Sequence, residues 1–291
     1  MAHKKLLAIF AVAATAAAMG MTGTATADST TGTTVLVTQD DIVTGSATPT
    51  AGDTSWYVEL KGSGAYSLVD DYGAPDGLDR SSLQLTTGTG EAKVKLMTNQ
   101  FAGTTLNDIT TLAYQTYQAP TGQWEGADAA FQLRIDLDGD VADVSDETTL
   151  VYEPYQAAGT SPIEPAAWQS WDVLAGSFWS TRASDHLVAG NGGSTMYTLQ
   201  QVLGFHPDAA VLGVGVNVGG NNANYTVATD GVTFGTAAGT TVFNFEHLVL
   251  PTDKDECKAD GWQTSFLPGQ FKNQGDCVSS VASSGASHSA R

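Results

Sequence analysis

The stretch Thr148–Ser180 reads TTLVYEPYQAAGTSPIEPAAWQSWDVLAGSFWS, and its spacing decides the fold expected for the chain. Thr148–Tyr155 and Ala167–Val173 are short runs rich in β-branched and aromatic residues, separated by a connection that contains Gly and Pro. Such runs predict two successive strands. Trp168 and Trp171 are three residues apart, so alternation along a strand sends their rings to opposite faces of a sheet. We therefore expect one ring in the core and the other exposed or covered by a loop.

The same pattern extends in both directions from this stretch. Short alternating runs recur about every eight to twelve residues, with turn residues between them, as in Trp56–Lys61 and Ala130–Leu137. Asp138-Gly139 is a strong hairpin signal. The spacing of apolar residues becomes helical over Ser194–Leu203, where Gly204 supplies a stop. This pattern predicts a mainly β protein, an antiparallel β-sandwich of jelly-roll type with one short helix.

The N-terminus predicts export. Lys4 and Lys5 precede an apolar run from Leu6 to Met19, and Ala25-Thr26-Ala27 follows. These are the features of a secretory signal peptide that is cleaved after about residue 27. The apolar run is shorter than the ~20 residues that span a bilayer. We therefore expect a secreted, extracellular protein without membrane insertion.

The remaining boundaries follow from shifts in composition. After the signal peptide (1–27), residues 28–54 are rich in Thr, Ser and Gly and predict a flexible arm, in which Thr34–Thr38 alone has the pattern of an edge strand. The sandwich is expected over 55–251, a disulfide-linked motif over 252–280 and a disordered Ser/Ala/Gly-rich tail over 281–291.

The chain has two cysteines, Cys257 and Cys277. In an exported protein such a pair predicts one disulfide. Helix-capping patterns precede both cysteines, so we expect two short helical turns joined by the disulfide. The side chains expected to fill the space between these turns are Trp262, Phe266 and Phe271.

The formal net charge of −19 excludes whole classes of partner. An acidic field of that size repels nucleic-acid phosphates and anionic lipid headgroups. Hydrophobic residues make up 42% of the chain, enough to form a core.

Two sets of motifs resemble known bacterial proteins. DKDECKADGWQTSFLPGQFKNQGDCV, which spans 253–278, is similar to a tail at the C-termini of many exported bacterial proteins with unrelated domains. TTLVYEP, WQSWD, FWS and AAVLGVGVNVG together resemble an uncharacterised group of secreted bacterial jelly-roll proteins. The resemblance covers roughly Trp56–Val278. It implies a concanavalin- or galactose-binding-like jelly roll followed by a small helical hairpin, and it implies no particular activity.

Catalytic motifs are absent from the sequence: it has no HExxH, GxSxG or phosphate-binding glycine loop. Glu153 and Glu246 lie on expected strands, and glycoside hydrolysis needs two carboxyls roughly 5–10 Å apart. The alternative is that each is a surface or strand-end acid without a catalytic role.

Asp136, Asp138 and Asp140 place carboxylates at alternate positions. Calcium takes six to eight oxygen ligands from a flexible loop, so this spacing is compatible with a calcium site. Gly139 does not fall where the EF-hand register requires glycine, however, and an acidic hairpin turn explains the same residues. No other cofactor is indicated.

Ligand binding is expected where an exposed ring lies beside amides, since a ring stacks on the apolar face of a sugar while amides bond its hydroxyls. Within the opening stretch we expect Trp171 to be this ring, with Tyr155 behind it. The loops that supply amides contain Asn191, Asn221 and Asn222. Most of the other aromatic residues are assigned to the core.

These expectations favour a secreted, non-catalytic binding protein for a carbohydrate or another cell-surface ligand. A polysaccharide-active enzyme that uses Glu153 or Glu246 is one alternative, and a structural or adhesive exoprotein is the other. The oligomeric state stays open.

Overall fold

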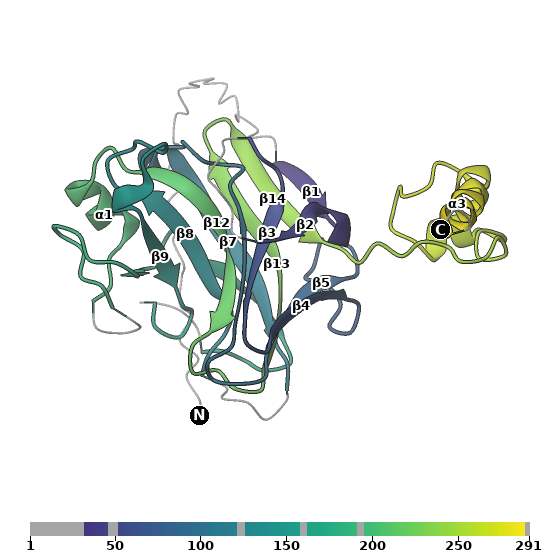
Figure 1. Cartoon of the computed structure of the whole chain (residues 1–291), viewed down its shortest axis with the longest axis horizontal. Coiled ribbons are helices and arrows are strands. Elements are labelled where there is room, and N and C mark those ends of the chain that lie inside the picture. The colour runs from purple at the N-terminus through teal and green to yellow at the C-terminus, as the bar shows by residue number, and fades with distance from the viewer. Residues whose placement is uncertain (1–31, 46–51, 121–125, 158–161, 191–194, 289–291) are drawn as a thin grey trace, which may run out of the picture.

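The computed structural model describes residues 32–45, 52–120, 126–157, 162–190 and 195–288, and in these residues two seven-stranded sheets pack face to face (Figure 1). The expected mainly β sandwich is confirmed. The signal peptide expected over 1–27 lies outside the described residues. No helix in the described part of the chain has the length and apolar character needed to cross a membrane.

The first sheet has the order β1-β14-β13-β5-β4, and β13 also pairs with β7, which pairs with β10. Its strands are β1 (Gly32–Val37), β4 (Gly64–Val69), β5 (Ser82–Thr87), β7 (Ile109–Gln118), β10 (Trp168–Asp172), β13 (Tyr225–Thr236) and β14 (Gly239–Phe245).

The second sheet has the order β11-β9-β8-β12-β6-β3-β2. Its strands are β2 (Ile42–Thr44), β3 (Trp56–Lys61), β6 (Lys93–Thr98), β8 (Ala130–Asp136), β9 (Thr148–Tyr152), β11 (Trp179–Ser180) and β12 (Ala210–Gly219).

Two edge strands correct the expected flexible arm. β1 runs parallel to β14 and β2 runs parallel to β3, so the segment 32–44 covers one edge of each sheet. A capping box between Thr38 and Asp41 starts the 3-10 turn η1 (Gln39–Asp41), which carries the chain from one sheet to the other. Strand pairing satisfies backbone groups that an open edge would leave unpaired. The flexible arm predicted over 28–54 is therefore wrong for this segment, and the sandwich is mixed rather than purely antiparallel.

Alternation of side chains builds the core between the sheets. Trp56 is fully buried, and its ring lies edge-on to those of Phe243 and Phe245 in the opposite sheet, with centroid distances of 5.0 and 4.9 Å. Edge-to-face contacts at this range are favourable for aromatic rings. Because Trp56 points into the core, alternate residues of its strand also point toward the core. The residues between them face outward.

The helix α1 (Leu199–Phe205) begins later than the periodicity predicts. Thr198 and Gln201 form a capping box in which each side chain bonds the backbone of the other, and this fixes the first turn. Leu199 and Val202 face the core. Two further 3-10 turns, η2 (Leu106–Asp108) and η3 (Val144–Asp146), lie in connections at strand ends.

The C-terminal motif stands apart from the sandwich (Figure 1). It contains α2 (Gly261–Thr264) and α3 (Gln274–His288), and the predicted disulfide Cys257–Cys277 is present. Phe266 and Phe271 pack against this disulfide, with Trp262 at the edge of the cluster. Because α3 continues from its disulfide-held first turn to His288, the disordered tail predicted over 281–291 is wrong for 281–288, while 289–291 lies outside the described residues.

Candidate functional site

The outer face of the second sheet carries the polar side chains of β8, β9 and β12. On β8, Phe131 and Leu133 belong to the core cluster, so Gln132 between them faces away from the core. On β12 the same alternation turns Val216 inward and Asn217 outward. A polar row therefore crosses neighbouring strands on the side away from the core.

A cavity of about 350 Å³ lies over this row, and we call it the β9 cavity. Its walls come from β6, β8, β9, β11 and β12 and from the turns that follow β9 and β12. It is lined by Lys93, Gln132, Val151, Glu153, Tyr155, Gln156, Trp179, Thr181, Asn217, Gly219, Gly220 and Asn221.

Two aromatic rings border the β9 cavity. Trp179 pairs with Val151 across β11 and β9 and is half-buried. Tyr155 is 45% exposed and is one of the exposed large hydrophobic residues in the described part of the chain. Pro154 follows β9 closely. The backbone N–H groups of Gln156 and Ala157 both donate to the Glu153 backbone carbonyl at 2.9 Å. This turn ends the strand and places Tyr155 at the rim of the cavity.

Glu153 is held between these rings. Its Oε2 accepts a hydrogen bond from the Trp179 indole at 3.2 Å and another from the side-chain amide of Gln156. Burial raises the pKa of Glu153, while the bond from Trp179 opposes the rise. The carboxylate therefore fixes the orientation of the indole ring toward the cavity.

Unsatisfied amide oxygens also lie at the β9 cavity. Asn217 Oδ1 and Gln156 Oε1 are buried, and neither accepts a hydrogen bond from a described residue. Lys93 also lines the cavity. Burial lowers the pKa of Lys93, and the positive charge of Lys95 lowers it further. A ligand with hydroxyl groups would satisfy these acceptors, since an unpaired buried polar atom costs free energy.

The turn after β12 brings Asn221 into the cavity wall. Gly220 and Asn221 have φ values of 61° and 71°, which glycine and asparagine tolerate best. A Cβ on Gly219 would lie 2.8 Å from the Lys93 side chain, so glycine is needed for this close approach. Asn222 is not part of the cavity lining: its amide donates to the Gly219 carbonyl at 3.2 Å and stabilises the turn.

Trp171 is not the exposed ring that we expected. It is 4% exposed, belongs to the core cluster, and its indole donates to Thr116 Oγ1 at 2.7 Å. Trp168 lies on the opposite face, where its indole donates to the Tyr72 carbonyl at 3.1 Å and its ring packs against Tyr117. The predicted division into one core ring and one loop-covered ring is confirmed, but Trp171 is the core ring because it pairs with buried Tyr114.

Glu153 and Glu246 do not meet. Glu246 follows β14 of the first sheet and is fully buried, and its carboxylate accepts backbone bonds from Arg80 at 2.9 Å and Ser81 at 3.1 Å. Glu153 directly follows β9 of the second sheet and has different partners. The catalytic pair considered above is therefore not assembled. Asn191 lies outside the described residues.

Sequence reasoning missed several residues of the site, among them Trp179, Asn217, Gln156 and Lys93. Trp179 is part of the opening stretch, but its strand β11 has only two residues and gives no alternation to interpret. Asn217 is a polar residue among valines and glycines on β12, and this signal was available in the sequence.

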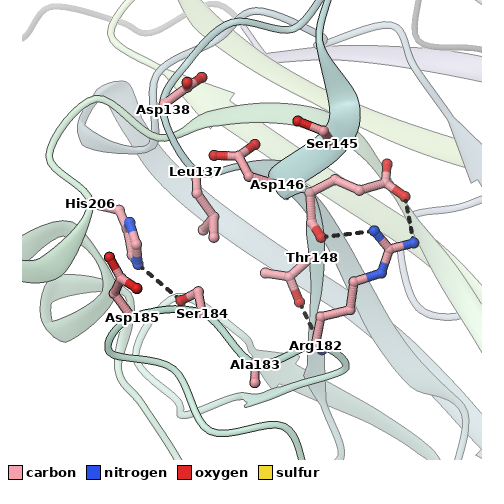
Figure 2. Close-up of a pocket in the computed structure, with 11 residues that line it drawn as sticks. Leu137, Asp138, Ser145, Asp146, Thr148, Arg182, Ala183, Ser184, Asp185 and His206 are labelled. Atoms are coloured by element: carbon pink, nitrogen blue, oxygen red, sulfur yellow. Dashed lines mark hydrogen bonds and ion pairs between the residues drawn. The ribbon is translucent and has the colours of Figure 1, made fainter.

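A second cavity, of about 390 Å³, lies where β8 leaves the sheet (Figure 2). Asp138 and Asp146 lie at one end of it, and Arg182 lies at the other, bonded to Glu147. The structure groups Asp136 and Asp138 with Asp146, not with Asp140. Asp140 is exposed and caps its own turn by accepting from the Ala142 amide at 3.2 Å, so it lies outside this group of acids.

Neither a protein-family model nor a curated protein sequence matches the chain. Among solved structures it is similar to the family 11 carbohydrate-binding module from Clostridium thermocellum in complex with a β-1,3-1,4-mixed-linked tetrasaccharide, at 11% identity and a TM-score of 0.36 over 66% of this chain and 90% of that chain.

A second similar structure is the family 11 module of the cellulosomal cellulase Lic26A-Cel5E of Clostridium thermocellum, at 14% identity and a TM-score of 0.35 over 66% of this chain and 89% of that one. A third, from work on the promiscuous specificity of carbohydrate-binding modules of the β-sandwich superfamily, has 14% identity and a TM-score of 0.34 over 64% of this chain and 58% of that chain. At TM-scores below 0.5, the ligand of this chain has to be argued from its own side chains.

Proposed function

We propose that this chain is a secreted, non-catalytic protein that binds carbohydrate in the β9 cavity. The observation that carries the proposal is the meeting of two aromatic rings, Tyr155 and Trp179, with unsatisfied amide oxygens in one cavity. The volume of about 350 Å³ falls in the range of roughly 300–1,000 Å³ that is usual for small-molecule sites.

Each part of the β9 cavity matches a part of a sugar. Tyr155 and Trp179 offer flat apolar surface for the C–H face of a pyranose ring. Asn217 Oδ1 and Gln156 Oε1 would accept bonds from ring hydroxyls, because no described residue donates to them. Lys93, which also lines the cavity, would donate to a hydroxyl oxygen of the ligand. A purely apolar ligand would leave these polar atoms unpaired, at a cost of roughly 1–3 kcal/mol each.

The acid content of the cavity favours binding over hydrolysis. Glu153 is the only carboxylate among the described residues that line it, whereas glycoside hydrolysis normally uses two. The hydrogen bonds from Trp179 and Gln156 give Glu153 a role in positioning the ring. A purely structural or adhesive role would leave the unsatisfied amide oxygens unexplained.

Export is supported by the N-terminal sequence and is consistent with the disulfide. Residues 1–27 have the pattern of a signal peptide, and a disulfide such as Cys257–Cys277 persists in oxidising compartments. Mass spectrometry of the mature N-terminus after expression in a secreting host tests this part of the proposal.

Binding is tested by a glycan array with the purified mature chain, followed by calorimetry with the best ligand. Trp179→Ala and Tyr155→Ala should each weaken binding about tenfold, since loss of one stacking contact costs on the order of 1.4 kcal/mol. Phe205→Ala is the matched control, because Phe205 is an aromatic residue of similar exposure outside the cavity.

Retained binding in both cavity variants would refute this site, and a wild-type chain that binds no glycan on the array would refute the function. Release of reducing sugars from polysaccharide, lost in Glu153→Gln, would replace the proposal with the enzymatic alternative.

A further inference from the structure

Asp136 is a buried carboxylic acid without a bonding partner. It is the last residue of β8 and is 0% exposed. Neither of its carboxylate oxygens accepts a hydrogen bond from a described residue. An isolated buried carboxylate is costly, and such a group normally pairs with a cation, coordinates a metal or stays protonated.

The two nearest acids converge on Asp136. Oxygens of Asp136, Asp138 and Asp146 all lie within 4.8 Å of one another. Two oxygens bound to one calcium ion at roughly 2.4 Å each are separated by at most about 4.8 Å, so the spacing of the three acids is compatible with a shared ion. Asp146 Oδ1 is a second buried oxygen without a partner among the described residues.

The cations close to this cluster are engaged elsewhere. Arg134 and Arg182 both form ion pairs with Glu147, and Figure 2 shows Arg182 at the opposite end of the cavity from Asp138. None of the ion pairs formed by the described residues includes a member of the cluster.

We propose that Asp136, Asp138 and Asp146 together bind one calcium ion. Carboxylate oxygens without a nitrogen or sulfur ligand suit a hard cation, and calcium completes its shell with carbonyls and water. Asp138 is exposed and the adjoining cavity is open, so water can reach the ion. Magnesium usually uses one or two carboxylates together with phosphate or several waters, which makes it the poorer match to three acids.

The ion would tie together two ends of one connection. Asp136 and Asp138 come from the end of β8, and Asp146 comes from η3, just before β9 begins at Thr148. The unfolded chain does not hold these acids together, so calcium binds the folded state alone and stabilises it. The site shares no lining residue with the β9 cavity. Calcium binding and carbohydrate binding can therefore fail separately.

The test is thermal unfolding of the chelator-stripped full chain with EGTA, CaCl₂ or MgCl₂, together with calorimetric titration of CaCl₂. We expect calcium at about 100 times its Kd to raise Tm by roughly 5–10 °C. Asp136→Asn and Asp146→Asn should abolish this rise. Asp140→Asn is the matched control, because it removes the same charge from the same loop outside the cluster and should keep the full response.

The calcium-free state of Asp136→Asn supplies a further readout. Because the substitution removes a buried, unpartnered charge, this variant in EGTA should melt no lower than the wild type at pH 8, which also shows that it folds. The proposal is overturned if calcium gives neither binding heat nor a shift in Tm. An equal rise in Tm with magnesium, or an equal loss of response in Asp140→Asn, would also overturn it.

Discussion

Asp128 shows how one buried acid makes the stability of the sandwich depend on pH. Its Oδ2 accepts a hydrogen bond from Thr116 Oγ1 at 2.6 Å, and its Oδ1 accepts from the Ala129 amide. Burial nevertheless raises the pKa of Asp128 to about 7. In the unfolded chain the value is about 3.9, so between these two values the folded chain holds a proton that the unfolded chain has lost. The free energy of unfolding should therefore fall as pH rises from about 4 to 7 and level off above 7.

Asp128→Asn removes this titration. We expect the free energy of unfolding of the variant, relative to wild type, to increase by roughly 2–4 kcal/mol between pH 4.5 and pH 8, as measured by urea denaturation. Asp71→Asn, which removes an exposed acid, should run parallel to wild type over the same range. Parallel curves for Asp128→Asn as well would contradict the buried-acid account.

For single residues, the sequence predicts which residue types form the site better than it predicts the face of the sheet on which each residue lies. Tyr155, Glu153 and Asn221 were all singled out, and all three line the β9 cavity. Trp171 was placed on the wrong face because alternation separates Trp168 from Trp171 without saying which face is inner. That choice depends on the pairing of β10 with β7, which sequence spacing does not contain.

Helix α1 depends on a local signal, so its stability is testable by one substitution. Thr198→Ala removes the side-chain acceptor for the Gln201 amide and should cost about 1 kcal/mol, or roughly 2–4 °C in Tm for a chain of this size. Thr198→Ser keeps the hydroxyl and should stay close to wild type. Equal melting of wild type and Thr198→Ala would show that packing of Leu199 and Val202 alone holds the helix.

Elements with strong local patterns were predicted well, and elements held by distant partners were not. The strand pattern over Thr34–Thr38 is confirmed by β1 at Gly32–Val37. β2 has only three residues and forms because it pairs in parallel with β3, more than ten residues further along the chain, so it leaves no periodicity to detect. The same limit applies to the cluster of Asp136, Asp138 and Asp146, where Asp146 joins Asp136 across a connection that spacing rules do not follow.

At the scale of the whole molecule, the described residues form two separate hydrophobic cores. The large core fills the sandwich, and the small one surrounds the disulfide Cys257–Cys277 in the C-terminal motif. Few polar contacts join the two parts in the described residues; in one of them the Arg80 guanidinium donates to the Ser265 carbonyl at 3.2 Å. Units with separate cores and few shared contacts are expected to unfold independently.

Removal of the disulfide tests this independence. A closed loop of this length contributes about 3 kcal/mol in the chain-entropy account, and the C-terminal motif has a small core with which to replace it. In a Cys257→Ser/Cys277→Ser variant we expect faster proteolysis within 252–280, located by mass spectrometry, while the main thermal transition of the sandwich moves by less than about 2 °C. Wild type under reducing conditions is the control and should behave alike, since the chain has no other cysteine. A fall of several degrees in the main transition would mean that the sandwich and the motif unfold as one unit.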